Sequence, residues 1–203
     1  MENKKLRLES KKQEVENSYF SLLTSHFSLL IAGFGGQGIL FAGKLLAQSA
    51  MLEGRHVTWF PSYGAEIRGG TANCTVIISD DMIGSPVVRQ PDSLLIMNEA
   101  SMKKFEPLLK PQGLLIINTS LIKDLPERSD IETVKIKATD IAEEFGSSQI
   151  ANMVMLGALI AKTRIINPGT ISTALKEIIP EHRKNAIQIN ERAFKGGLKG
   201  IAY

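Results

Sequence analysis

Cysteine is almost absent from the chain, whose 203 residues include a single one, Cys74. One thiol cannot build an intrachain disulfide framework, and it cannot by itself hold a zinc ion or an iron–sulfur cluster. The three histidines, His26, His56 and His182, are too scattered to form a metal-ligand motif. The sequence therefore excludes a self-contained zinc or iron–sulfur protein. Because Cys74 lies within an apolar run, we expect a small core residue there and not a reactive thiol.

Strong charge of one sign and long apolar runs are missing as well. The formal net charge is +3, which gives no reason to expect nucleic acid or anionic lipid as a partner. No apolar run is long enough to cross a bilayer. The first twenty residues mix acids and bases and lack the apolar core of a secretory signal. By elimination we expect a cytoplasmic protein that binds neither nucleic acid nor membrane.

The chain reads as one domain, because 43% of its residues are hydrophobic and its length suits a single core. Residues 1–25 are a polar N-terminal extension, and 26–203 form the α/β domain. Short apolar runs alternate there with segments of helical spacing, which indicates a mainly parallel sheet covered on both faces. We thus predict a single Rossmann-like domain of three layers. The expected strands are 27–33, 55–60, 71–79, 93–99, 113–120 and 131–138.

A glycine-rich stretch, Gly33–Lys44 (GFGGQGILFAGK), fits two nucleotide-binding templates. The P-loop reading fails, because Leu45 replaces the Ser or Thr that binds Mg²⁺ and Lys44 falls inside the predicted helix. The dinucleotide fingerprint has the right context of strand, turn and helix. In it, Gly33 would permit the sharp turn, Gly35 the approach of a ligand, and Gly38 close helix–strand packing. Free amides at the helix start would then face an anion.

The sequence supports NAD binding less well than it supports the tight glycine turn. It needs an acidic residue near the end of the second strand to hold the ribose, and no Asp or Glu follows that strand until Glu66. Two interpretations of the glycines stay open: an anion-facing loop, or glycines that only let strand and helix pack closely.

A second glycine segment, SYGAEIRGGTANC, follows the second expected strand. Arg68 beside Glu66 would offer a fixed guanidinium for a phosphate or carboxylate, and Gly69 and Gly70 would allow close approach of another surface. The loop should lie next to the first glycine turn, at the sheet edge where such folds bind ligands. The alternative is a Glu–Arg pair that merely orders the loop.

Taken together, the segments 33–54 and 62–80, with IGSP, NMVMLGAL and NPGTISTAL further on, resemble one family. It is the gamma subunit of 2-oxoacid:ferredoxin oxidoreductases, and the likeness runs from about Leu29 to Phe194. Either glycine segment alone is a weak signal, whereas both in this order and spacing are fairly specific. The sequence of residues 66–73, EIRGGTAN, looks most like that of the 2-oxoglutarate branch. The N-terminal extension departs from the usual short start of the family.

The resemblance implies a complex that converts a 2-oxoacid, CoA and oxidised ferredoxin to acyl-CoA, CO₂ and reduced ferredoxin. It also implies thiamine diphosphate, Mg²⁺ and iron–sulfur clusters on alpha, beta and ferredoxin-like delta subunits, since this sequence has no Gly-Asp-Gly motif and one cysteine. This chain would bind none of these cofactors alone and would supply no catalytic group. Its glycine-lined surface would face CoA and the subunit interface, and an isolated chain could self-associate.

The candidate site is therefore a set of binding residues. Most come from the two glycine segments: Gly35, Gly36, Gln37, Gly38, Glu66, Arg68, Gly69 and Gly70. Asn152, at the start of an apolar helix, is a further candidate, and its alternative role is an ordinary helix cap. Two other hypotheses remain: a self-sufficient NAD-binding oxidoreductase, and a scaffold subunit without ligand contact.

Overall fold

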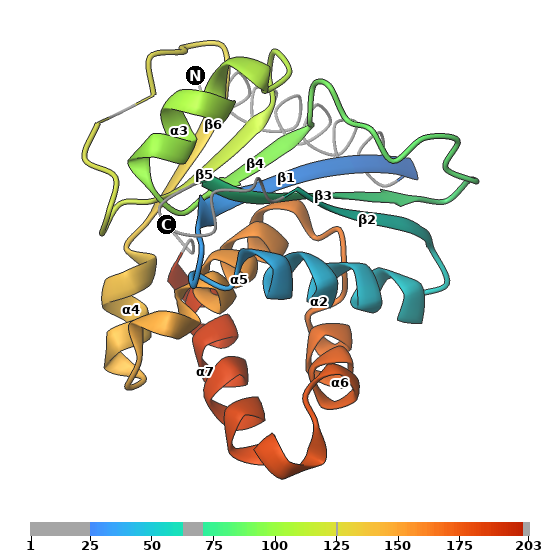
Figure 1. Ribbon diagram of the computed structural model, residues 1–203, viewed down its shortest axis with the longest axis vertical. Coiled ribbons are helices and arrows are strands. Elements are labelled where there is room, and N and C mark those ends of the chain that lie inside the picture. The colour runs from blue at the N-terminus through green and yellow to red at the C-terminus, as the bar shows by residue number, and fades with distance from the viewer. Residues whose placement is uncertain (1–24, 63–70, 125, 201–203) are drawn as a thin grey trace, which may run out of the picture.

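A computed structural model describes residues 25–62, 71–124 and 126–200 of the chain. These residues form one six-stranded sheet with helices on both faces (Figure 1). The strands are β1 (His26–Phe34), β2 (His56–Ser62), β3 (Thr71–Ser79), β4 (Ser93–Ile96), β5 (Leu114–Asn118) and β6 (Glu132–Ile136). The α-helices are α2 (Ile39–Leu52), α3 (Glu99–Phe105), α4 (Ala138–Glu144), α5 (Ala151–Thr163), α6 (Pro168–Ile178) and α7 (Lys184–Gly200). The short 3₁₀ helices are η1 (Glu106–Leu108), η2 (Ser148–Ile150) and η3 (Glu181–Arg183). The three-layer α/β prediction is confirmed, while the proposed extension, 1–25, lies almost wholly outside the described residues.

The sheet order is β2-β3-β1-β4-β5-β6. β1, β4, β5 and β6 pair in parallel, whereas β3 runs antiparallel to both of its neighbours, β1 and β2. The sheet is thus mainly parallel, as predicted. The antiparallel strand is the part that hydrophobic patterning does not reveal, because a buried apolar run looks alike in either direction.

The central strands are buried on both faces, and their side chains alternate between two cores. Leu29 and Ile31 of β1 belong to the larger core, beneath α2, α5, α6 and α7, whereas Leu30 and Ala32 belong to the smaller core beneath α3. Figure 1 shows α3 on one side of the sheet and the other labelled helices on the opposite side. Period-two alternation explains how a continuous apolar run serves both faces.

α5 is the innermost helix: its first ten residues, from Ala151 to Ile160, are all buried. It packs against α7 at a point where two glycines meet, Gly157 on α5 and Gly197 on α7. A Cβ added to Gly157 would lie 2.9 Å from the backbone nitrogen of Leu198, and one added to Gly197 would lie 2.7 Å from the carbonyl carbon of Val154. The two helices therefore touch backbone to backbone. None of the described helices is both long and apolar enough to span a membrane.

Candidate functional site

The first glycine segment forms the connection from β1 to α2, at the carboxyl edge of the parallel strands. The turn takes its left-handed backbone at Gly36 (φ 93°) and Gly38 (φ 71°), conformations that favour glycine. Gly33, which was expected to permit the sharp turn, does not itself take a left-handed conformation. Gly35 is exposed, with open space where a Cβ would stand, so another surface can approach it.

The side chain of Gln37 is folded back onto its own loop. Its Oε1 accepts a hydrogen bond from the backbone N–H of Phe34 at 2.7 Å and a second from Nδ2 of Asn98 at 3.2 Å. A Cβ on Gly33 would lie 2.6 Å from this oxygen, so Gly33 makes the space that Gln37 fills. Its carboxamide oxygen thus holds the turn, and the expected contact of Gln37 with a ligand or partner stays a prediction.

Asn152 connects the turn to the innermost helix. It lies one residue inside α5, whose N-cap is Ile150, so the alternative role of Asn152 as a helix cap is wrong. Its buried side chain donates from Nδ2 to the carbonyl oxygen of Gly38 at 3.0 Å. The same carbonyl accepts the N–H of Ala42, the first hydrogen bond of α2. Asn152 and the glycine turn, 114 positions apart in the sequence, are therefore brought into direct contact.

The second glycine segment lies mostly outside the described residues. Glu66, Arg68, Gly69 and Gly70 all fall in 63–70, so their placement stays a prediction. The strands that flank this segment are described: Ser62, the last residue of β2, pairs with Asn73. Thr71, the first residue of β3, pairs with Phe34 at the end of β1. Both ends of the segment thus lie at the sheet edge that carries the glycine turn.

Two asparagines that the sequence analysis missed lie at the same edge. Asn98 follows β4 and caps α3 by accepting the N–H of Ser101 at 2.8 Å. Asn118 ends β5, accepts the N–H of Ala138 at 3.1 Å, and donates to Oγ1 of Thr139 at 2.8 Å. Both are buried polar residues at or just after the end of an apolar strand, which is the signal that could have identified them.

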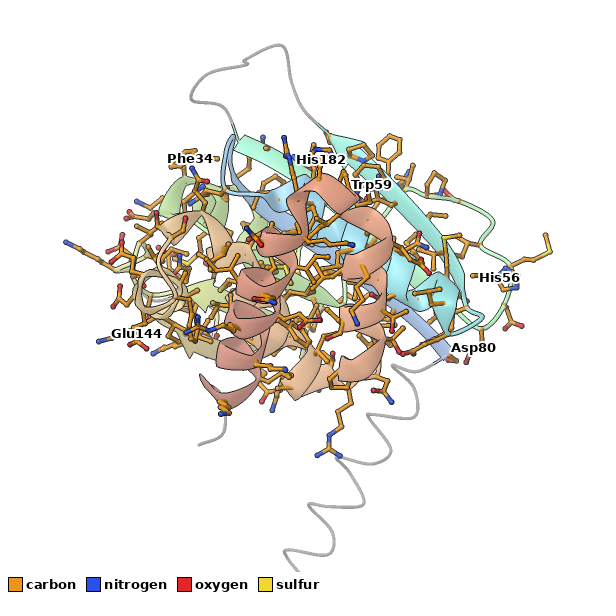
Figure 2. The ribbon with its side chains drawn as sticks, turned by 90° about the horizontal axis from the view of Figure 1, so that it is seen from below. Phe34, His56, Trp59, Asp80, Glu144 and His182 are labelled. Atoms are coloured by element: carbon orange, nitrogen blue, oxygen red, sulfur yellow. The ribbon has the colours of Figure 1, made fainter. Side chains whose placement is uncertain are left out.

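Exposed apolar side chains surround this edge. Phe34 is 40% exposed beside the glycine turn, and Leu121, three residues after β5, is 45% exposed. Figure 2 shows Phe34 at one end of the molecule and Asp80, just after β3, near the other. The edge thus combines backbone amides, buried carboxamides and exposed apolar groups, a combination suited to contact with another molecule.

Cys74 is a core residue, as predicted, and is fully buried. Burial raises the pKa of its thiol to about 12, and Sγ donates to the carbonyl of Ile39 at 3.6 Å. This thiol does not fit an iron–sulfur cluster, which needs several accessible thiolates. Within the described ranges, moreover, no three His, Cys, Asp or Glu side chains gather as a metal site would require.

The buried thiol should be inert in the folded chain. We expect iodoacetamide at pH 8 to leave Cys74 unmodified in the native protein, because only the thiolate reacts and burial suppresses it. Intact-mass measurement should show one added carbamidomethyl group after denaturation and none before. Rapid modification of the folded chain would contradict this assignment.

Comparison with known proteins places the chain in a family. Residues 28–200 match the family model of pyruvate ferredoxin/flavodoxin oxidoreductase, and the chain belongs to that family. The resemblance predicted from the two glycine segments is thereby confirmed. Three relatives illustrate the match in sequence and structure.

A ketoisovalerate oxidoreductase subunit, VorA of Methanothermobacter marburgensis, is 42% identical over 131 residues, 64% of this chain and 27% of the relative. The chain therefore spans about a quarter of that protein's length. The 2-oxoglutarate synthase subunit KorC of the same organism is 36% identical over 174 residues, 82% of this chain and 92% of the relative. The solved gamma subunit of a keto/oxoacid ferredoxin oxidoreductase from Geobacter sulfurreducens is 30% identical, with a TM-score of 0.74, and the match covers 86% of this chain and 97% of that one.

Proposed function

We propose that this chain is the gamma subunit of a 2-oxoacid:ferredoxin oxidoreductase complex that oxidatively decarboxylates 2-oxoglutarate to an acyl-CoA with reduction of ferredoxin. The observation that carries the proposal is the match to a 2-oxoglutarate synthase subunit, over 82% of this chain and 92% of the relative. The sequence EIRGGTAN at 66–73, which resembles the 2-oxoglutarate branch, supports the same substrate. Thiamine diphosphate, Mg²⁺ and the clusters then belong to alpha, beta and ferredoxin-like delta partners.

In this proposal the chain contributes a binding surface and no catalytic group. Gly35 and Gly36 present their backbone to CoA or to a neighbouring subunit, and Arg68, oriented by Glu66, supplies the cationic contact. Gly69 and Gly70 allow close approach, while Gln37, Gly38 and Asn152 hold the turn in place. The exposed Phe34 beside the turn supports a subunit contact, since an apolar side chain gains stability when a partner covers it.

The arrangement of strands argues against a self-sufficient NAD-binding enzyme. In dinucleotide-binding sheets the second strand lies beside the first, so that an acid at its end reaches the ribose. Here antiparallel β3 separates β2 from β1. The Gln37–Asn98 hydrogen bond also crosses the gap between β1 and β4, where a dinucleotide would bind. We expect titration of the isolated chain with NADH to show no micromolar binding.

One observation favours a second candidate, a scaffold subunit without ligand contact. Gln37 turns its carboxamide oxygen inward and so satisfies the N–H of Phe34 that an anion would otherwise meet. The two candidates differ in their kinetics, because a scaffold affects assembly but leaves the apparent KM for CoA unchanged.

The distinguishing variant is Arg68→Ala, tested after the chain is mixed with its partner chains. We expect the KM for CoA in ferredoxin reduction to rise about 10- to 100-fold, which corresponds to one lost charge-assisted hydrogen bond. Arg89→Ala is the matched control: Arg89 lies near His26 and Ser28, at the opposite end of β1. An unchanged KM in Arg68→Ala with full assembly would reject the role of Arg68, and a loss of assembly with normal KM would favour the scaffold.

A further inference from the structure

Asn98 lies just after β4, next to the turn that follows β1, and both polar atoms of its side chain form hydrogen bonds. Its Oδ1 accepts the N–H of Ser101, which caps α3, and its Nδ2 donates to Oε1 of Gln37 at 3.2 Å. The residue is 3% exposed, so an unmade hydrogen bond here would leave a buried polar atom without a partner. Both the oxygen and the nitrogen of the carboxamide are thus engaged in hydrogen bonds.

The cap alone does not require asparagine. Aspartate and serine cap helices as well as asparagine does, because only an acceptor is needed. Asparagine differs from aspartate in the donor at Nδ2, and in this structure that donor reaches Gln37. The amide nitrogen of Asn98 therefore makes a contact that capping of α3 does not require.

The Asn98–Gln37 bond joins the connections that follow two adjacent parallel strands. α2 follows β1 and packs on the larger core, whereas α3 follows β4 and packs on the smaller one (Figure 1). The helices leave the sheet on opposite faces, so the backbone ladder alone does not fix one connection relative to the other. The carboxamide pair supplies that link across 61 positions of sequence.

Gln37 is the point through which this link reaches the glycine turn. It lies between Gly36 and Gly38, both at positive φ, and its Oε1 holds the N–H of Phe34. Glycine on both sides lets the backbone adopt other conformations, and within the turn Gln37 and Phe34 exchange two hydrogen bonds, at 3.2 and 2.7 Å. Asn98 adds a contact to Gln37 from outside the turn.

We propose that Asn98 is a positioning residue that, through Gln37, fixes the conformation of the turn 35–38 and hence the direction of its amide groups. That the turn then meets CoA or a subunit rests on the proposed function; the positioning of the turn does not. The inference adds a residue outside both glycine segments to the candidate site.

The test uses Asn98→Asp in the full-length chain. Aspartate keeps the acceptor for Ser101 but faces Oε1 of Gln37 with a second oxygen, so Gln37 must move away or rotate and release Phe34. We expect the amide of Phe34 to exchange its hydrogen about tenfold faster, as loss of one hydrogen bond predicts, when exchange is followed by NMR. Asn118→Asp is the matched control, because the hydroxyl of Thr139 can reverse its hydrogen bond and donate to the new carboxylate.

A second variant covers the case in which Asn98→Asp does not fold. Asn98→Ser keeps an oxygen that can cap α3 and removes the Nδ2 donor to Gln37, without placing a carboxylate opposite Oε1. It should accelerate exchange at Phe34 to a similar extent. Unchanged exchange at Phe34 in a folded variant overturns the proposal.

The complex reconstituted with partner chains separates this inference from the proposed function. Faster exchange together with a raised KM for CoA, at an unchanged kcat, supports both. Faster exchange with normal assembly and normal KM for CoA leaves the positioning role standing and rejects the contact of the turn with CoA. Normal exchange rejects the positioning role whatever the kinetics show.

Discussion

Replacing Gly197 with alanine is expected to lower the melting temperature of the isolated chain by about 6–12 °C. The added Cβ would lie 2.7 Å from the carbonyl carbon of Val154, and closer still to its oxygen, so α5 and α7 must separate. Overpacking of a core costs up to about 3 kcal/mol, and here the obstacle is backbone that cannot rotate away. For a chain of this size each kcal/mol corresponds to roughly 2–4 °C.

The matched control is Gly169→Ala in α6. There the added Cβ meets only Oδ1 of Asn167, at 3.3 Å, and alanine favours the helix by up to about 1 kcal/mol. Thermal denaturation followed by circular dichroism should show little change or a small gain for Gly169→Ala. Equal melting temperatures for the two variants would mean that α5 and α7 do not meet through their backbones.

The fold was largely predictable from local pattern. Each expected strand corresponds to one in the structure: short apolar runs mark the central strands, which are buried on both faces, and alternation marks β6. Pro168 begins α6, as a proline in a first helical turn does. The direction of β3 and its insertion between β1 and β2 depend on long-range pairing, such as Phe34 with Thr71, which local pattern does not contain.

The candidate site likewise has a local part that the sequence predicts and a long-range part that it does not. The glycine turn is local, and the sequence identified it because positive φ at Gly36 and Gly38 restricts the residue type. The contacts that hold it are not local: Asn98 reaches Gln37 over 61 positions and Asn152 reaches Gly38 over 114. Asn98 escaped notice because the expected strand, 93–99, included it, whereas β4 ends at Ile96 and Asn98 caps α3.

Gly38→Ala should destabilise the chain by about 2–5 kcal/mol, the second large effect expected. A left-handed conformation costs a non-glycine residue about 1–2 kcal/mol. The new Cβ would also lie 2.9 Å from Cγ of Asn152 and closer still to Nδ2. Asn152 must then give up its hydrogen bond to the Gly38 carbonyl while it stays buried, which adds about 1–3 kcal/mol.

Gly54→Ala separates these two contributions, because Gly54 has nearly the same backbone angle (φ 76°) and no atom within 4 Å of an added Cβ. Urea denaturation should give about 1–2 kcal/mol of destabilisation for Gly54→Ala, the backbone cost alone. Adding Asn152→Ala to Gly38→Ala should cost less than the sum of the two single substitutions, since the smaller side chain makes room for the new methyl group. Strict additivity would show that Asn152 does not contact the turn, and Asn152 would then leave the candidate site.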